Sequence, residues 1–216
     1  MGRASERVWS LLFPNRCLLC GAPLPPVQPV CAACLDKLLP LGGAELDALA
    51  VRVGCGVTVP YQYAGALRGA LHRFKFRDRP AAYRGFARLI AQRLPAVSFD
   101  CVTFAPMVAA KQRARGYNQA ELLAKGLASV LRLPCRKLLV KLADTPAQHT
   151  LSAEERARNA AGAYALRRPL DLTGRTVLVV DDVVTTGSTA AALVDCLRRA
   201  GATVHCAALA HPCRTH

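Results

Sequence analysis

Thr176-Val-Leu-Val-Val-Asp-Asp-Val-Val-Thr-Thr-Gly-Ser-Thr-Ala190 joins a hydrophobic run to an acidic pair and then to a turn of small residues. The hydrophobic run, residues 177–180, shows no alternation of polar and apolar side chains, so it predicts a strand covered on both faces, as parallel strands are. Residues 190–200 carry apolar side chains at helical spacing and end before Gly201, which predicts a helix. The stretch therefore predicts an α/β fold, a parallel sheet flanked by helices.

The acidic pair and the turn have the composition of a binding site. Asp181 and Asp182 follow the predicted strand directly, where open α/β sheets bind ligands. A helix start offers unpaired N–H groups, so a turn of small residues can wrap a phosphate. The turn consists of Thr185, Thr186, Gly187, Ser188 and Thr189. We interpret the pair and the turn as a site for a ribose 5-phosphate; the alternative is an ordinary turn whose polar residues only cap the helix.

This pattern resembles the loop that binds 5-phosphoribosyl 1-diphosphate (PRPP) in type I phosphoribosyltransferases. The resemblance implies that Asp181 and Asp182 hold the ribose hydroxyls at the catalytic centre, that residues 185–189 hold the 5-phosphate, and that Mg2+ accompanies PRPP. The sequence contains neither G-x-x-x-x-G-K-[ST] nor G-x-G-x-x-G, so neither a P-loop nor a dinucleotide-binding fingerprint is available.

A second motif consists of Cys17, Cys20, Cys31 and Cys34, in two C-x-x-C turns. Each turn brings two sulfurs to one side, so two turns complete a tetrahedral zinc site with no open position for catalysis. We expect a structural Zn2+ in a small N-terminal ribbon rather than a redox pair, because a redox C-x-x-C would not come doubled with a short spacer. The other cysteines of the ten in the chain are interpreted as small buried hydrophobes.

The chain is strongly basic, with 29 Lys and Arg against 14 Asp and Glu, which favours contact with nucleic acid or with phosphorylated ligands. Residues 67–93 hold an arginine-rich segment interleaved with aromatic residues. Its cations are Arg68, Arg73, Lys75, Arg77, Arg79, Arg84, Arg88 and Arg93. The aromatic residues can stack on bases, but we favour a core role for Phe74 and Phe86, while the arginines are interpreted as a polyanion surface.

The apolar segment at residues 8–13 is too short for a membrane span or a secretory signal, so we expect no membrane span and a cytoplasmic protein. We expect residues 1–13 to form a short packed helix and residues 118–131 a longer one. Further strands are expected at residues 53–63, as a hairpin, and at 100–105, 135–141 and 203–210. Residues 111–119 are expected to link strand and helix as a loop, 143–160 to form a binding loop, and 211–216 to form a frayed tail.

Together these motifs resemble the ComF family of DNA-uptake competence proteins. The matching motifs are the four-cysteine ribbon, Phe74-Lys75-Phe76, Arg115-Gly-Tyr-Asn-Gln-Ala-Glu-Leu-Leu-Ala124, Thr145-x2-Gln148-x2-Leu151, Glu155-Arg156 with Asn159, and the PRPP loop. The resemblance implies a zinc ribbon with an N-terminal helix at residues 1–50 and a type I phosphoribosyltransferase-like domain at 51–216. Within that domain, 51–95 is the basic part and 96–216 the PRPP-binding α/β core. Two departures are Phe104-Ala-Pro106, where Pro-Val-Pro is usual, and Lys141, where Arg is common.

The resulting hypothesis is a PRPP-binding, zinc-containing accessory protein for the uptake or processing of single-stranded DNA. Zn2+ is expected as its structural metal, Mg2+ as the companion of PRPP, and other DNA-uptake proteins as partners. Two alternatives stay open at this point. One is an active phosphoribosyltransferase with an unknown acceptor, and the other is a regulator that senses PRPP without catalysis.

Overall fold

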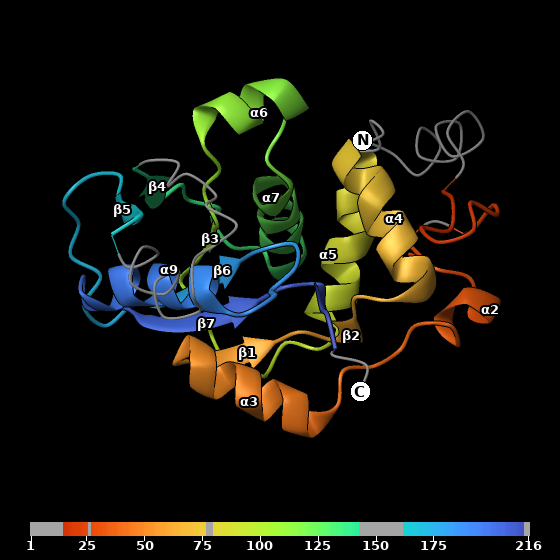
Figure 1. Ribbon diagram of the computed structural model, residues 1–216, viewed down its shortest axis with the longest axis horizontal. Coiled ribbons are helices and arrows are strands. Elements are labelled where there is room, and N and C mark those ends of the chain that lie inside the picture. Colours follow the sequence, from red (N-terminus) through yellow and green to blue (C-terminus); the bar gives the residue numbers. More distant parts are fainter. Residues whose placement is uncertain (1–14, 26, 77–79, 143–161, 214–216) are drawn as a thin grey trace, which may run out of the picture.

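The computed structural model describes residues 15–25, 27–76, 80–142 and 162–213, and its centre is a sheet of parallel strands (Figure 1). The order across the sheet is β1 (Gly56–Thr58), β7 (Thr203–Ala207), β6 (Thr176–Val180) and β3 (Cys101–Phe104). Strand β6 lies inside the sheet, where it pairs with β3 on one side and β7 on the other. Residues 177–180 are at most 1% exposed, because helices cover both faces. The predicted parallel sheet and its buried strand are confirmed.

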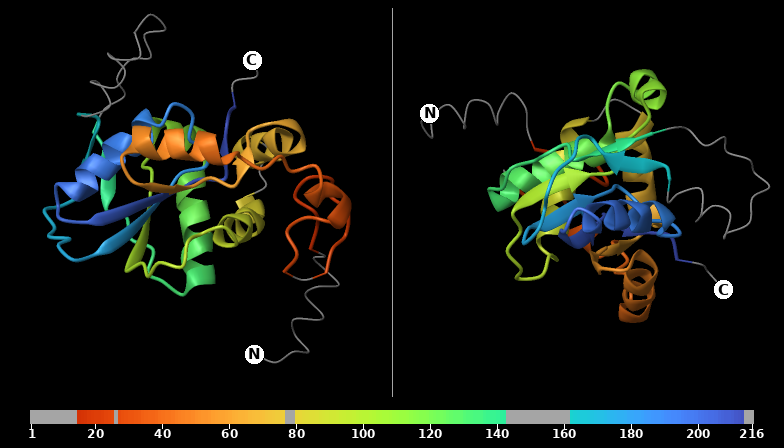
Figure 2. Two further views of the ribbon diagram at one scale, coloured as in Figure 1. Left: turned by 90° about the horizontal axis from the view of Figure 1, so that it is seen from below. Right: turned by 90° about the vertical axis from the view of Figure 1, so that its left-hand side faces the viewer.

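The helices form two layers around this sheet (Figure 2). Helix α7 (Gln119–Leu131) packs on β3 and β6, and α5 (Tyr83–Ala91) packs on α7. Helix α9 (Ser188–Arg198) packs on β7 at the other face, together with α3 (Gly43–Val53), which also contacts β1. In a parallel sheet with right-handed crossovers, helices lie on opposite faces when their connections run in opposite directions across the sheet.

The chain changes its direction of travel between β3 and β6. After β3, helix α7 leads outward to Cys135, which bridges Val102 on the outer side of β3. After β6, helix α9 leads the other way, to β7. Because the two connections diverge, a crevice opens at the carboxyl ends of β3 and β6, and this is the place where open α/β sheets bind ligands.

A small antiparallel pair lies outside the main sheet. It consists of β4 (Leu139–Lys141) and β5 (Tyr164–Leu166), with Val140 opposite Ala165. The expected strand at residues 135–141 is therefore wrong as one unit: Cys135 bridges the sheet, and only the last three residues form β4. The expected binding loop at 143–160, with Thr145, Gln148, Leu151, Glu155, Arg156 and Asn159, lies outside the described residues, as do residues 1–13.

The hairpin expected at residues 53–63 is also wrong. Strand β1 pairs in parallel with β7, and β2 (Tyr61–Gln62) pairs in parallel with β8 (Ala210–His211). Each short strand therefore pairs with a strand from residues 203–211, near the other end of the sequence. Residues 59 and 60 connect the two strands without a chain reversal. Alternation of apolar residues in the sequence reveals strands but not their partners, which here lie about 150 residues away.

Two segments that were expected to be irregular contain ordered residues. Residues 111–119 contain most of helix α6 (Ala109–Arg115), which protrudes from the body in Figure 1 and has no buried residue. His211, expected in a frayed tail, is only 8% exposed, and its Nδ1 lies 2.7 Å from the carbonyl oxygen of Val184. Among the described residues no helix is both long and apolar enough to cross a membrane.

The arginine-rich segment forms α4 (Gly65–Phe76), the short 3-10 turn η1 (Pro80–Ala82) and α5. Phe74 and Phe86 are fully buried and meet edge to face, with ring centroids 5.5 Å apart, which confirms the core interpretation of these two aromatics. Arg73 Nη2 donates to the carbonyl oxygens of Leu18 and Leu19, at 3.3 and 3.0 Å.

A second arginine of this segment, Arg88, donates from Nη1 to the carbonyl oxygen of Val27 at 3.2 Å. Arg73 and Arg88 therefore hold the N-terminal ribbon, residues 15–25 and 27–35, against α4 and α5. The interpretation of all these arginines as a polyanion surface is corrected for these two, because their guanidinium groups are engaged by backbone carbonyls.

Candidate functional site

A cavity of about 170 Å3 opens at the carboxyl ends of β3 and β6. Its walls come from the end of α4, the turn after β3, α6, the start of α7, β4, the residues after β6 and the start of α9. Its lining includes Asp181, Asp182, Thr189, Lys75, Lys111, Arg115, Lys141, Asn118, Gln119 and residues 105–108. Two carboxylates and four cations thus face one small volume, a composition suited to a ligand with both hydroxyl and phosphate groups.

The acidic pair is anchored from both sides. Asp182 Oδ2 lies 2.7 Å from Lys75 Nζ, and the two side chains are 14% and 20% exposed. The backbone N–H of Asp182 donates to Asp181 Oδ1, and that of Val183 donates to Asp182 Oδ1, each at 2.8 Å. The carboxylates are therefore held by their own turn, while Lys75 neutralises one of them.

The second carboxylate, Asp181, is desolvated. Burial raises its pKa from 3.8 to about 7, and the neighbouring charge of Asp182 adds to the rise. The hydrogen bond from the Asp182 N–H and the positive charge of Lys75 oppose it without cancelling it. A carboxyl group with this pKa exchanges its proton near neutral pH.

The turn after β6 depends on Gly187, whose φ of 86° is in the left-handed region. A Cβ at this position would lie 3.2 Å from Val53 Cγ2 and 3.4 Å from Leu49 Cδ1, so α3 closes the turn from behind. Gly187 is also the N-cap of α9 and supplies no capping side chain. The hydroxyls of Thr186 and Ser188 lie 2.6 Å apart across the turn. Backbone N–H groups at this helix start are the donors that an anion would need.

The residues predicted for the PRPP loop divide between two cavities. Asp181, Asp182 and Thr189 line the cavity described above. Thr185 and Thr186 are exposed and line a neighbouring cavity of about 570 Å3, whose wall also includes Glu45, Arg52 and His211. Gly187 and Ser188 join the two groups along the turn.

Sequence reasoning did not assign a site role to Lys75, Asn118 or Gln119. Asn118 Nδ2 donates to the Ala105 carbonyl oxygen at 3.0 Å, and its Oδ1 accepts from Ala120 N at 3.0 Å, so it ties the start of α7 to the end of β3. Gln119 is 2% exposed and accepts from Arg115 Nη1 at 2.8 Å. Its Nε2 has no hydrogen-bond partner among the described residues. Two sequence motifs contain these residues, Phe74-Lys75-Phe76 and Arg115–Ala124, but neither motif by itself indicates a role in the site.

The antiparallel pair β4–β5 reaches the cavity through Lys141, the last residue of β4. Lys141 Nζ lies 5.9 Å from the centre of the Tyr164 ring. Burial raises the pKa of Tyr164, and a hydrogen bond with the Thr189 side chain opposes the rise. Tyr164 thus connects β5 to the first turn of α9, and the Lys141 that replaces the common Arg still places a cation at the cavity.

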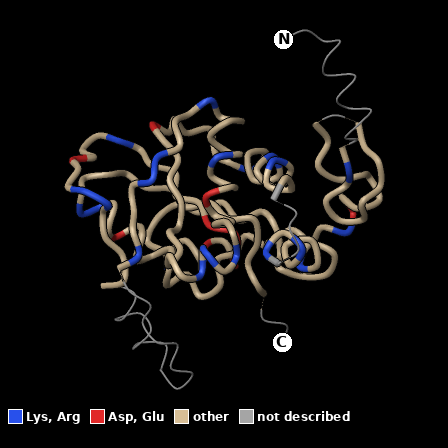
Figure 3. The backbone as a smooth tube through the Cα atoms, turned by 90° about the horizontal axis from the view of Figure 1, so that it is seen from above, with Lys and Arg blue, Asp and Glu red and all other residues tan. Residues whose placement is uncertain are grey.

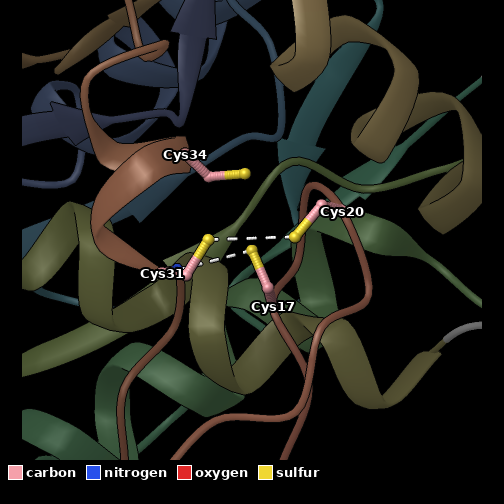
Figure 4. Close-up of side chains that lie close together, drawn as sticks. All are labelled: Cys17, Cys20, Cys31 and Cys34. Atoms are coloured by element: carbon pink, nitrogen blue, oxygen red, sulfur yellow. Dashed lines mark hydrogen bonds between the residues drawn. The ribbon is translucent and has the colours of Figure 1, made fainter.

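The four cysteines of the ribbon converge, as Figure 4 shows. Their sulfurs all lie within 4.8 Å of one another, and the Sγ atoms of Cys20 and Cys31 are 3.8 Å apart. A tetrahedral site with Zn–S bonds of about 2.3 Å requires sulfurs about 3.8 Å apart. Cys34 belongs to α2 (Ala32–Leu35), which follows Cys31 directly. The four residues therefore fit a structural zinc site.

The thiols of this cluster resist ionising together. Burial and the neighbouring thiols raise the pKa of Cys34 to about 12. Burial also acts against ionisation of Cys17, but backbone N–H groups of Cys20, Cys31 and Leu19 outweigh it and lower its pKa to about 6. A divalent cation removes the repulsion among thiolates, so ion binding and ribbon stability are coupled.

Two family models match the chain. A model described as the double zinc ribbon domain matches residues 8–45. A model described as the phosphoribosyl transferase domain matches residues 118–215, which include α7, β6 and the turn after it. The first match includes the four cysteines, and the second includes the acidic pair and the Gly187 turn, whereas Lys75, Lys111 and Arg115 lie outside both.

Relatives named DNA utilization protein YhgH match most of the chain. The protein of Escherichia coli O6:H1 is 34% identical over 220 residues, which cover 89% of this chain and 94% of that protein. The protein of Salmonella typhimurium is 32% identical with the same coverage.

Among solved structures, a glutamine PRPP amidotransferase from B. subtilis is similar, with 24% identity and a TM-score of 0.44. The match covers 63% of this chain and 30% of the amidotransferase, so this chain spans about a third of that protein. An adenine phosphoribosyltransferase from Thermoanaerobacter pseudethanolicus aligns with a TM-score of 0.38 and 21% identity.

For the ribbon we predict one Zn2+ per chain, bound by Cys17, Cys20, Cys31 and Cys34. Replacing Cys17 and Cys34 by Ser removes two of the four ligands, so elemental analysis should find the zinc lost and proteolysis should cut the ribbon. The matched control replaces two cysteines outside the cluster, Cys55→Ser with Cys213→Ser, and should keep its zinc. Full zinc content in the first variant would contradict the ligand assignment.

For Asp181 we predict a stability change that depends on pH. The pKa of its carboxyl is higher in the folded protein than its ordinary value, so its ionisation lowers the free energy of unfolding as pH rises from about 4 to about 7. Asp181→Asn avoids this cost and should be more stable than wild type at pH 8, by on the order of 1 to 4 kcal/mol. The difference should vanish near pH 4.

Urea unfolding at pH 8 and at pH 4 measures this difference. Asp195→Asn, which alters an exposed carboxyl on α9, is the control and should stay close to wild type at both values. A gain for Asp181→Asn that is equal at the two values would show that ionisation of Asp181 is not its cause.

Proposed function

Because this chain belongs to the ComF family, we propose that it is a PRPP-binding, zinc-containing accessory protein for the uptake or processing of single-stranded DNA. One observation carries the PRPP part. The acidic pair Asp181 and Asp182 stands at the point where the chain connections diverge, directly before the left-handed turn at Gly187 and the start of α9. The DNA part is supported by relatives whose name is DNA utilization protein, and by the 29 basic residues of the chain.

In this proposal each end of PRPP has its own binding groups. The carboxylates of Asp181 and Asp182 accept hydrogen bonds from the ribose hydroxyls, and residues 185–189 hold the 5-phosphate. The diphosphate lies toward the cationic wall of the cavity, where Lys75 and Lys111 are found. Mg2+ supplies positive charge to the diphosphate when bound, and carboxylate and phosphate oxygens are the ligands it prefers.

A second candidate function is phosphoribosyl transfer, and the observation that favours it is the pKa of about 7 for Asp181. A buried carboxyl with this value can accept a proton near neutral pH, which a nitrogen acceptor must release as it bonds to the ribose. The test incubates the protein with labelled PRPP, Mg2+ and a panel of bases and small amides. Diphosphate release that needs one acceptor and is lost in Asp181→Asn would establish transfer.

For PRPP binding we predict that substitutions in the acidic pair and in the Gly187 turn have different effects on ligand affinity. Asp181→Asn with Asp182→Asn removes the charges that strengthen hydroxyl hydrogen bonds, at about 1.5 to 3 kcal/mol per bond, so PRPP should bind more weakly. Gly187→Val places a branched side chain on a backbone with φ of 86° and against Val53, so ribose 5-phosphate should no longer bind either.

Titration calorimetry with PRPP and with ribose 5-phosphate measures both effects, and circular dichroism checks the fold. Because Gly187→Val can also disturb packing, the pair Thr186→Ala with Ser188→Ala tests the turn without a steric change. Asp195→Asn serves as the control with one charge removed. Undiminished PRPP affinity in both folded turn variants would place the ligand elsewhere.

For the DNA part we predict binding of single-stranded DNA that weakens steeply with salt. Each phosphate contact releases a bound counterion, so log K should fall by about 0.7 per contact for each unit of log salt concentration. Fluorescence anisotropy with a labelled oligothymidine over a KCl series measures this slope. No binding at low salt would refute the DNA part and leave the PRPP part untouched.

A further inference from the structure

A groove lies at the other end of the sheet from the candidate site. Asp100 and Arg175 directly precede β3 and β6, so they mark the amino ends of these strands, whereas Asp181 stands at the carboxyl end of β6. A cavity of about 780 Å3 opens there. Its lining consists of Asp100, Cys101, Arg136, Lys137, Leu138, Arg167, Arg168, Leu170, Asp171, Leu172 and Arg175. No motif recognised in the sequence contributes to it.

The charges of this cavity are unbalanced. Arg175 is paired with Asp100, with 2.9 Å between Nη1 and Oδ1, and Asp171 Oδ1 accepts from the backbone N–H of Thr173 at 2.9 Å. The remaining cations are Arg136, Lys137, Arg167 and Arg168, all exposed. Among the described residues these four side chains have neither a carboxylate partner nor a hydrogen bond. Five cations against the two carboxylates Asp100 and Asp171 leave the lining of this cavity with a net charge of +3.

The cavity continues into a second one. A neighbouring cavity of about 690 Å3 shares Leu170 and Asp171 with it and adds Arg198 and Arg199 from the end of α9. We call the two together the amino-end groove. In Figure 3, Lys and Arg positions occur at the end of the molecule away from the N-terminal ribbon, together with some Asp and Glu positions. A row of cations along two joined cavities is suited to an extended polyanion more than to a single small phosphate.

The floor of the groove differs from its rim. Leu138 and Leu172 are 8% and 6% exposed, and Leu170 packs beside them. The cations stand around this apolar surface. A single strand presents its phosphates and its base faces at once, so it can use both the rim and the floor. A duplex keeps its base faces stacked inside and would leave the apolar floor unused.

The arginine-rich segment is the competing location. There, Arg73 and Arg88 are engaged by carbonyl oxygens of the ribbon, and Lys75 is paired with Asp182. In the amino-end groove, Arg175 is paired with Asp100 and Arg199 is hydrogen-bonded to the Cys196 side chain. Arg136, Lys137, Arg167 and Arg168 have no such partner among the described residues. Counting only the cations that the structure describes, the groove therefore offers more uncommitted positive charge in one concave surface than the arginine-rich segment does.

We propose that the amino-end groove binds the phosphodiester backbone of single-stranded DNA. The proposal rests on the DNA part of the proposed function and gives it a location. Because the groove and the acidic pair lie at opposite ends of the strands, DNA and PRPP bind the same chain without competing. No chemistry is required of the groove, only the release of counterions from the strand.

The test compares two pairs of substitutions with equal loss of charge. Arg136→Gln with Arg167→Gln removes two groove cations, and both side chains are exposed, so the fold should persist. Arg68→Gln with Arg84→Gln removes two exposed cations of the arginine-rich segment. Anisotropy with labelled oligothymidine over a KCl series should show the salt slope reduced by about 1.4 in the groove variant and unchanged in the control.

Four other results would contradict the proposal or a part of it. If wild type binds DNA and the groove variant keeps the full slope, the groove is not the site, although the proposed function survives. A reduced slope in the control alone would place the strand on α4 and α5. A duplex of equal length that binds as tightly as the single strand would contradict the role of the apolar floor. PRPP titrated into the DNA complex should leave the anisotropy unchanged, and displacement would overturn the claim of separate sites.

Discussion

The ion pair between Lys75 and Asp182 connects the two parts of this protein. Arg73, Phe74 and Lys75 are consecutive in the last turns of α4, and each holds a different part of the structure. Arg73 binds carbonyl oxygens of the ribbon, the Phe74 carbonyl oxygen accepts from the Tyr117 hydroxyl before α7, and Lys75 binds the acidic end of β6. The two charged side chains are mostly buried, so loss of either partner would leave an uncompensated charge. The end of α4 therefore couples the metal-binding ribbon to the cavity.

The acidic pair lowers the stability of the fold but provides hydrogen-bond acceptors for a ligand. Two adjacent carboxylates at a buried strand end repel each other, and Lys75 neutralises only Asp182. The raised pKa of Asp181 is the physical sign of this cost. A ligand that brings hydroxyl groups to these carboxylates supplies the hydrogen bonds that burial took away. Residues that lower stability in this way are typical of binding and catalytic sites.

Features encoded in short stretches could be predicted from the sequence, and features that depend on distant partners could not. Strand β6 with its acidic pair, and the four-cysteine cluster, are each encoded in a short stretch of sequence. The resemblance to the ComF family extended the prediction from these stretches to the whole fold. Lys75 lies more than a hundred residues from Asp182, so their pairing left no local pattern. The same holds for β1, whose partner β7 is a late strand, and for the amino-end groove, which is assembled from four separate segments.

The most direct test of the account is a crystal structure of the protein with PRPP and Mg2+. We expect electron density for the ribose at Asp181 and Asp182, for the 5-phosphate at the backbone N–H groups of residues 185–189, and for the diphosphate near Lys75. Density for PRPP in the amino-end groove, with the acidic pair and the Gly187 turn unchanged, would contradict it.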